Sequence, residues 1–156
     1  MIALRIMTED EYNNWVKYSI SDYAKNLFKA EKYSETEAIK QAEKEFYSLL
    51  KNGLDTPGHH LFVAENDNKI PVGVIWYITA DANCIFIADF LVYEEYRRMG
   101  YGIAILTKLE RKVKPEGFSM IKLHVFRHNI PAIKLYEKCG FVPIKGDGDL
   151  YMEKQI

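Results

Sequence analysis

The spacing of apolar residues divides the chain into helical and extended stretches. Between residues 8 and 52, apolar positions recur about every 3.6 residues, which predicts two consecutive helices. Each helix begins at a hydroxyl residue with a glutamate three positions later, which is the spacing of a capping box. These pairs are Thr8 with Glu11 and Ser34 with Glu37. A short strand at Leu4–Met7 is predicted before the helices, and Gly53 is expected to end the second one.

The pattern changes after residue 58. Three short segments rich in β-branched and aromatic residues follow one another, separated by turn-forming stretches. They are HLFVAE at 60–65, VGVIWYIT at 72–79 and CIFIADFLV at 84–92. This pattern predicts a meander of three antiparallel strands.

Helices and strands alternate in the remaining third of the chain. A helix is predicted from about Gly102 to Val113, followed by a strand at 119–126. Asn129 is expected to cap a further helix, which Gly140 ends. The stretch 141–155 predicts a closing hairpin whose turn contains GDGD.

The predicted order is therefore β-αα-βββ-α-β-α-ββ, in one domain over residues 1–156. A meander combined with strand–helix–strand crossovers indicates an α/β (α+β) fold, a mixed sheet with helices on both faces.

Composition narrows the classes of function. The chain has 48% hydrophobic and 28% charged residues and a formal net charge of -1, so no overall basic field favours nucleic acid or an anionic membrane. Its two cysteines form no CxxC motif, which suits a reducing compartment. With no apolar run near the ~20 residues of a membrane span and no secretory signal, we expect a soluble cytoplasmic protein.

The segment RRMGYG at 97–102 joins a predicted strand to a predicted helix. Backbone N–H groups at a helix start lack intrahelical partners and attract anions. Gly100 and Gly102 would allow close approach of a phosphate, and Arg97 and Arg98 would add charge. The segment is neither a Walker A loop nor a GxGxxG fingerprint, and taken alone it also fits a plain turn with solvated arginines.

A second motif lies in HVFRHNIPAIKLYEKCGF, where Asn129, Ala132 and Tyr136 fall about two helical turns apart on one face. The segment FLVYEEYRRMGYG together with the N-x-x-A-x-x-x-Y-x-x-x-G-F pattern resembles the GNAT superfamily of N-acetyltransferases. The resemblance covers roughly Ile85 to Phe141.

The resemblance implies a strongly bent, mostly antiparallel mixed sheet in which acetyl-CoA lies between two splayed strands. Backbone groups of Leu91 and Val92 would pair with the pantetheine arm, and backbone N–H groups of Arg98 to Gly102 would hold the pyrophosphate. The full set of implied cofactor-binding residues is Leu91, Val92, Arg97, Arg98, Met99, Gly100, Tyr101, Gly102, Asn129, Ala132 and Tyr136.

The chemistry that the resemblance implies is acetyl transfer to a primary amine of a small molecule, peptide or protein. Tyr136 is expected to act as the general acid that protonates the leaving thiolate. Asp89 and His124 are candidate general bases, although each also fits a structural role and a water relay could replace both. No metal is expected, since His59 and His60 point to opposite faces of a strand.

Two further points stay open at this stage. A non-catalytic acyl-CoA-binding or interaction module of the same fold is the alternative function, and a homodimer is compatible with the sequence. The amine acceptor is expected to be cationic and to bind the first two helices, Tyr12 to Leu54. The glutamates proposed to attract it are Glu31, Glu35 and Glu37.

Overall fold

The computed structural model describes residues 1–146 and 148–156, and the chain forms two compact units. One unit consists of Met1–Ile6 and Gly58–Ile156, and the other of Met7–Pro57. Within the described residues, four α-helices and seven strands follow one another in the predicted order. The assignment of residues 1–156 to a single domain stays a prediction.

The unit Met7–Pro57 is a pair of helices, α1 (Glu9–Lys29) and α2 (Glu35–Leu49). The Phe46 ring of α2 packs against Trp15 and Tyr23 of α1, with both ring centroids 5.9 Å away. These contacts join the two helices through aromatic side chains, which supply large buried surfaces.

Both predicted caps of this unit are confirmed. The Thr8 hydroxyl accepts a hydrogen bond from the Glu11 backbone N–H, and the Glu11 carboxylate accepts one from the Thr8 N–H. The Ser34 hydroxyl accepts from the Glu37 N–H. The predicted end of the second helix is wrong by a few residues: α2 ends at Leu49, and Gly53 begins a separate 3-10 turn with φ of 57°.

The other unit is built on a seven-stranded sheet with the strand order β1-β2-β3-β4-β5-β7-β6. Only β4 and β5 are parallel among these neighbours, so the sheet is mixed and mostly antiparallel, as predicted. The strands are β1 (Ala3–Ile6), β2 (His59–Glu65), β3 (Pro71–Thr79), β4 (Cys84–Val92), β5 (Met120–Val125), β6 (Val142–Pro143) and β7 (Leu150–Gln155). Asp147, in the predicted GDGD turn between β6 and β7, lies outside the described residues.

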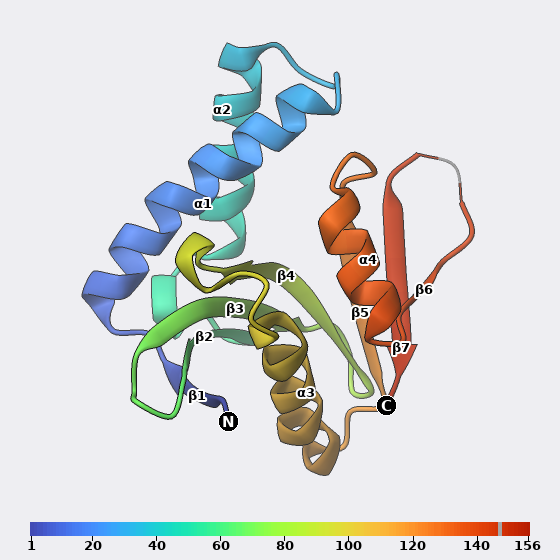
Figure 1. Ribbon diagram of the computed structural model, residues 1–156. Coiled ribbons are helices and arrows are strands. Elements are labelled where there is room, and N and C mark those ends of the chain that lie inside the picture. The colour runs from blue at the N-terminus through green and yellow to red at the C-terminus, as the bar shows by residue number, and fades with distance from the viewer. Residues whose placement is uncertain (147) are drawn as a thin grey trace. The chain divides into compact units, whose positions relative to one another are not determined.

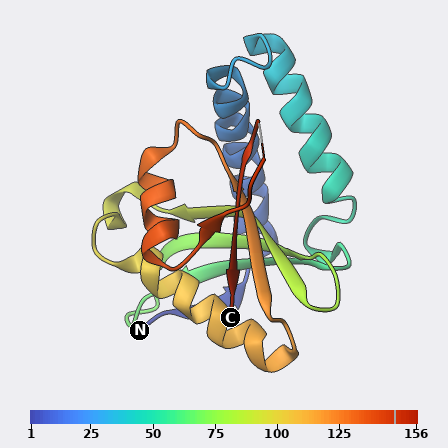
Figure 2. The ribbon, with the colours of Figure 1, turned by 90° about the vertical axis from the view of Figure 1, so that its right-hand side faces the viewer.

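Helices α3 (Tyr101–Val113) and α4 (Ile130–Lys138) lie on one side of this sheet, here called the helix side (Figure 1 and Figure 2). Ile105 and Leu109 of α3 are fully buried in one core with Ile85 of β4 and Leu123 of β5. Each such side chain contributes about 1.5–3 kcal/mol through its removal from water. This core fixes both helices against the strands that carry the predicted site. None of the described helices is long and apolar enough to cross a bilayer.

Strand β4 contains an irregularity that the sequence did not indicate. Against β3, Ile87 pairs with Tyr77 and Asp89 pairs with Trp76, so Ala88 is an extra residue of a β-bulge. Bulges bend a strand and increase its twist. The parallel pairing of β4 with β5 ends at the same level, with Ile87 opposite Leu123. Beyond the bulge, the segment Ala88–Val92 of β4 therefore diverges from β5.

Candidate active site

The diverging segment of β4 presents backbone groups in a regular alternation. In an antiparallel pair, every second residue directs both its N–H and its C=O toward the neighbouring strand. The Tyr93 N–H donates to the Val72 carbonyl of β3, and counting back from Tyr93 places the Leu91 groups toward β3 as well. Val92 and Phe90 therefore direct their backbone groups away from β3, toward the side where β5 diverges. Leu91 and Val92 were both predicted to contact the pantetheine arm, but only the backbone groups of Val92 point away from β3.

Phe90 shares the backbone orientation of Val92 and was not among the predicted residues, although strand alternation could have indicated it. Residues i and i+2 of a strand share one edge, so a prediction on Val92 implies Phe90 rather than Leu91. The Phe90 side chain also packs against the helix-side core, and its ring centroid lies 6.4 Å from that of Tyr136.

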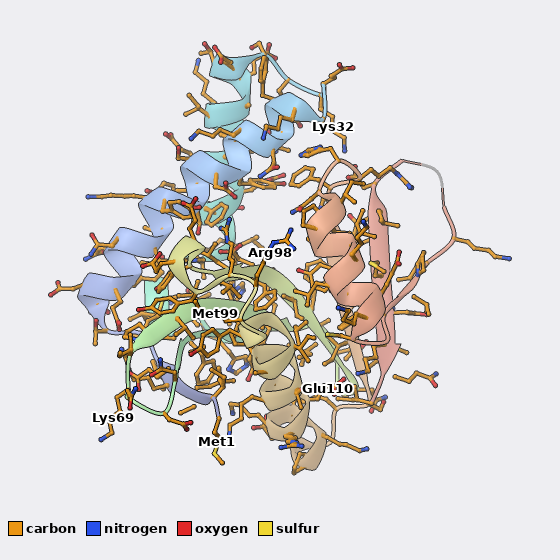
Figure 3. All side chains as sticks on the ribbon, viewed as in Figure 1. Met1, Lys32, Lys69, Arg98, Met99 and Glu110 are labelled. Carbon is orange, nitrogen blue, oxygen red and sulfur yellow. The ribbon has the colours of Figure 1, made fainter. Side chains whose placement is uncertain are left out.

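The corner after β4 has the backbone geometry of an anion site. Gly100 is the N-cap of α3 with φ of 84°, and Arg98 has φ of 60°. Both values lie in the left-handed region, which glycine adopts readily and other residues rarely do. Figure 3 shows Arg98 and Met99 at this corner, between the end of β4 and the start of α3. The first N–H groups of α3 have no carbonyl partner within the helix, so they are suited to bind phosphate oxygens.

The two arginines of the corner differ in what they contact. The Arg97 Nε donates to the Val92 carbonyl at 3.0 Å, so the side chain folds back onto the strand end. This bond occupies one of the Val92 groups that face away from β3. Arg97 therefore fixes the geometry of the strand end, and Arg98 is exposed at the corner.

Gly102 has a packing role that the sequence analysis did not anticipate. A Cβ atom at this position would lie 3.0 Å from the Leu135 Cδ2 of α4. A Cβ at Gly100, in contrast, would meet no atom within 4 Å. The absence of a side chain at Gly102 therefore allows α3 and α4 to approach each other closely.

Helix α4 begins with the predicted cap. The Asn129 side chain accepts a hydrogen bond from the Ala132 N–H at 3.3 Å, which confirms Asn129 as the N-cap. Because its backbone is not helical, Asn129 precedes the face formed by Ala132, Ile133 and Tyr136 instead of belonging to it. The contacts of Asn129 and Ala132 with a cofactor stay predictions.

Tyr136 lies in an apolar, aromatic environment near the diverging segment. Its side chain is buried, and its ring lies 5.7 Å from that of Phe141 and 6.4 Å from that of Phe90. Burial raises the pKa of the Tyr136 phenol well above its ordinary value, and the charge of the Asp89 carboxylate raises it further. The phenol therefore retains its proton at neutral pH, as a general acid must.

Asp89 lies on the side of the sheet opposite α3 and α4, here called the far side. It pairs with Trp76, whereas the neighbouring Phe90 pairs with Ile75 of the helix-side core. The bulge at Ala88 lies directly before it. Asp89 is still close enough to raise the Tyr136 pKa. Asp89 and Tyr136 thus lie on opposite sides of the sheet near the point where β4 leaves β5, and their roles in catalysis stay predictions.

His124 is the first residue of β5 beyond the last pair with β4. Its neighbours Leu123 and Val125 belong to the helix-side core, so His124 faces the far side. Its Nε2 lies 3.6 Å from the Asp149 Oδ2, an ion pair whenever the imidazole is protonated. Sequence spacing could not reveal this pairing, since His124 lies on β5 and Asp149 in the bend directly before β7.

Glu35 and Glu37, two of the three glutamates predicted to attract an acceptor, have local roles in the unit Met7–Pro57. The Ser34 hydroxyl donates to the Glu37 carboxylate at 2.8 Å. Glu35 and Glu37 lie in the first turn of α2, where negative charge complements the helix dipole. Their contribution to acceptor binding stays a prediction.

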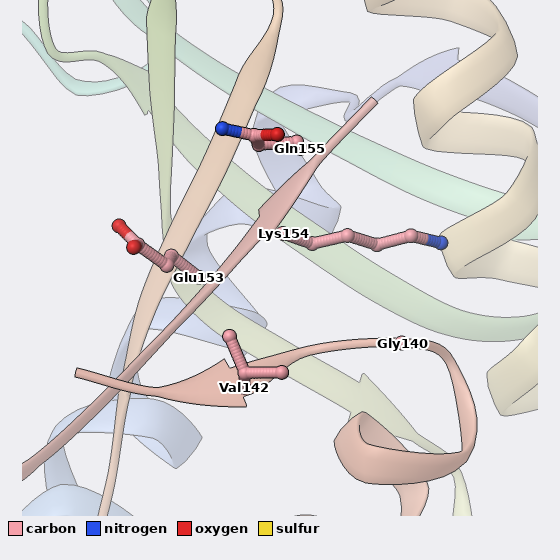
Figure 4. Close-up of a pocket in the computed structure, with 5 residues that line it drawn as sticks. All are labelled: Gly140, Val142, Glu153, Lys154 and Gln155. Atoms are coloured by element: carbon pink, nitrogen blue, oxygen red, sulfur yellow. The ribbon is translucent and has the colours of Figure 1, made fainter.

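A pocket lies at the other edge of the sheet, where β6 stops beside β7 (Figure 4). Its lining residues are Gly140, Val142, Glu153, Lys154 and Gln155. Lys154 extends from β7 toward α3 and pairs with Glu110 of that helix. The pocket includes none of the residues predicted for cofactor or catalysis. Among the described residues, no group of three or more metal-ligating side chains was found.

Known proteins share the family pattern and the fold of this chain. Residues 21–141 match the model of the acetyltransferase (GNAT) family. The chain is 34% identical to the uncharacterized N-acetyltransferase YycN of Bacillus subtilis (strain 168) over 99% of each protein. It superposes on the crystal structure of the putative acetyltransferase YycN from Bacillus subtilis with a TM-score of 0.90, covering 95% of this chain and 96% of that chain.

Two more distant structures share the fold. The PaiA N-acetyltransferase from Thermoplasma acidophilum, in complex with coenzyme A, gives a TM-score of 0.75 at 20% identity over 100% of this chain and 99% of that one. The spermidine N-acetyltransferase from Vibrio cholerae, in complex with CoA and spermine, gives 0.66 at 18% identity over 99% and 95%.

Proposed function

Because this chain belongs to the GNAT family of acetyltransferases, we propose that it transfers the acetyl group of acetyl-CoA to a primary amine by direct attack on the thioester. The observation that best supports this reaction is the divergence of β4 from β5 at Ala88, directly before a helix start with left-handed Arg98 and Gly100. An extended arm can pair along such a strand while its phosphates bind the helix start.

The choice of co-substrate is supported by the shared fold. The PaiA protein and the Vibrio cholerae enzyme were each solved with coenzyme A. In this chain, we propose that the backbone of Val92, and that of Phe90 in place of Leu91, pairs with the pantetheine arm. The N–H groups from Arg98 to Gly102, including those of Met99 and Tyr101, would hold the pyrophosphate, with Asn129 and Ala132 on the side of α4.

The reaction needs two proton transfers, and the site holds one group for each. The amine nitrogen attacks the thioester carbon, its proton passes to Asp89 directly or through water, and the carbon–sulfur bond breaks. The phenol of Tyr136 then gives its proton to the leaving thiolate. A backbone N–H on the diverging segment would polarise the carbonyl. His124 remains a second candidate base, although its neighbour Asp149 also fits a structural pair.

In this proposal, the charge of Asp89 would couple the two transfers. The charge on Asp89 raises the pKa of the phenol, so Tyr136 holds its proton before the reaction begins. When Asp89 accepts the amine proton, that charge disappears and the phenol becomes a stronger acid. Tyr136 would therefore release its proton most readily at the moment when the thiolate forms.

The location of the reaction in the cell is inferred from the thiols. Cys84 and Cys139 are both free, which suits the reducing conditions of the cytoplasm. We propose a cytoplasmic enzyme on this ground.

A thiol-release assay with acetyl-CoA over a panel of amines tests the proposed function. Amine-dependent release of CoA, with the acetylated amine identified by mass spectrometry, is the expected result. Calorimetric binding of CoA without turnover on any amine would favour the alternative, a non-catalytic acyl-CoA-binding module.

A further inference from the structure

Four aromatic rings form a continuous row on the far side of β5 and β7. The His124 ring makes edge contacts with Tyr151 at 5.2 Å and with Phe126 at 5.0 Å between centroids. The Phe126 ring in turn stacks on His128 at 5.4 Å. Asp149 lies beside the row, with its carboxylate 3.6 Å from the His124 Nε2. We call these five residues the ring row.

The ring row is accessible to a ligand. Tyr151 is 43% exposed, and the Asp149 side chain is 35% exposed. His128 is also exposed, at the turn after β5. The residues next to His124 on β5 and Tyr151 on β7 point to the helix side, where Leu123 and Met152 are buried in the core. The row thus presents Tyr151, Asp149 and His128 to solvent, whereas the His124 side chain is only 21% exposed.

The ring row begins where the reaction is proposed to occur. His124 directly follows Leu123, the last β5 residue to pair with β4. Asp89 follows the bulge on β4 and also faces the far side, beside its partner Trp76. An amine that delivers its proton to Asp89 therefore has the ring row next to it, across the divergence of the two strands.

We propose that the ring row binds the part of the acceptor beyond the reacting nitrogen, and that it selects acceptors with a second positively charged group. This inference rests on the proposed N-acetyltransferase function. Ring faces attract cations through their quadrupoles, and a half-exposed carboxylate beside them adds charge complementarity. The sheet itself would then determine acceptor choice, through residues that are separate from those predicted to hold acetyl-CoA.

Equilibrium binding of two matched amines tests the inference without turnover. 1,4-Diaminobutane and butylamine have the same carbon chain, but only the first has a second ammonium group. Each is titrated by calorimetry into the protein saturated with CoA, at about pH 8.5, above the ordinary range of histidine titration. We expect the diamine to bind more tightly. Tyr151→Leu and Asp149→Asn should each reduce this preference by up to about tenfold, through weaker diamine binding alone.

Asp67→Asn is the matched control for the loss of one negative charge. Asp67 is exposed, pairs with the N-terminal ammonium group, and lies in the β2–β3 turn. This variant should keep the full preference for the diamine. Equal binding of the two amines to the unaltered protein, or an unchanged preference in both ring-row variants, would overturn the inference. The proposed function fails separately, if no amine supports thiol release.

Discussion

Strands β4 and β5 are hydrogen-bonded to each other along one part of their length, here called the closed part, and diverge along the rest, here called the open part. The two parts differ in whether their backbone groups are available to a ligand. In the closed part, Cys84–Ile87 pairs in parallel with Met120–Leu123. In the open part, Ala88–Val92 continues against β3 while β5 continues against β7. Both parts belong to one predicted strand, in which Asp89 of the open part is the one charged residue among apolar neighbours.

The two parts differ in the hydrogen-bond partners of their backbone N–H and C=O groups. In the closed part, N–H and C=O groups bond to the neighbouring strand, as buried backbone groups must. In the open part, the groups of Phe90 and Val92 face away from β3, and a ligand with amide groups can bond to them. The extra residue Ala88 thus coincides with the change from a backbone paired on both sides to one that is open toward β5.

Deletion of Ala88 would break this comparison and should have the largest effect. Without the extra residue, β4 would pair regularly with β3, and Ile87 and Asp89 would each keep their present side of the sheet. The bend would be lost, and kcat/KM should fall by about 100-fold or more, as misplaced reacting groups commonly cause. Steady-state kinetics measure the loss, and circular dichroism checks the fold. A folded deletion variant with normal kinetics would show that the bulge does not create the site.

Two buried tyrosines allow the parts to be compared directly. Tyr136 lies near Phe90 of the open part, and Tyr77 pairs with Ile87 of the closed part. Tyr136→Phe should lower kcat by about 100-fold with little change in the KM for acetyl-CoA, since the phenol acts only as the thiolate leaves. The control Tyr77→Phe should leave kcat nearly unchanged. Similar kcat values for the two variants would refute the role of Tyr136 as the acid.

Variants of Gly102 can distinguish a role of this residue in cofactor binding from a role in the packing of α3 against α4. Gly102→Ala should raise the KM for acetyl-CoA by about tenfold, either through crowding of the phosphate or through contact with Leu135. The double variant Gly102→Ala/Leu135→Ala removes that contact. We expect affinity to stay low, because a side chain in the first turn of α3 would still limit how closely a phosphate can approach the backbone N–H groups there. Recovery of affinity in the double variant would assign Gly102 to packing alone.

The smallest expected effect concerns stability at high pH. Burial raises the pKa of Tyr77 above its ordinary value of about 10, which still applies in the unfolded chain. Below that value the phenol is neutral in both states; above it, the unfolded chain loses its proton first, so stability falls as pH rises. Between pH 9 and 11, the melting temperature of Tyr77→Phe should therefore fall by about 2–4 °C less than that of the unaltered protein. Equal falls would show that Tyr77 ionises as easily when folded as when unfolded.

The elements with strong local signals were predictable from sequence. The β4 bounds Cys84–Val92 agree with the prediction, and α3 begins one residue from its expected start. The caps at Thr8, Ser34 and Asn129 were also correct, because the donor and acceptor of a cap lie within three residues of each other. The corner RRMGYG and Tyr136 could also be assigned from sequence, because each belongs to a short motif with fixed spacing.

Features that depend on partners distant in sequence were not predictable. The bulge at Ala88 depends on register against β3, and the segment CIFIADFLV reads as one uninterrupted strand with no signal for an extra residue. The contact of Gly102 with Leu135 and the pair of His124 with Asp149 join separate elements. In α2, Ile39 fits the apolar stripe and is nevertheless 50% exposed, since a stripe does not show how far the packing extends.

The environment of Trp76 has an optical consequence. Its indole N–H donates to the His59 Nδ1 at 3.1 Å, and its strand partner is Asp89. The chain has two tryptophans, and the other, Trp15, belongs to the separate unit Met7–Pro57. In a Trp15→Phe variant, all indole fluorescence would come from Trp76, and charge changes at Asp89 would shift its emission. In that variant, the fluorescence emission of Trp76 could therefore be used, without any added label, to follow charge changes at Asp89 when an amine is mixed with the protein.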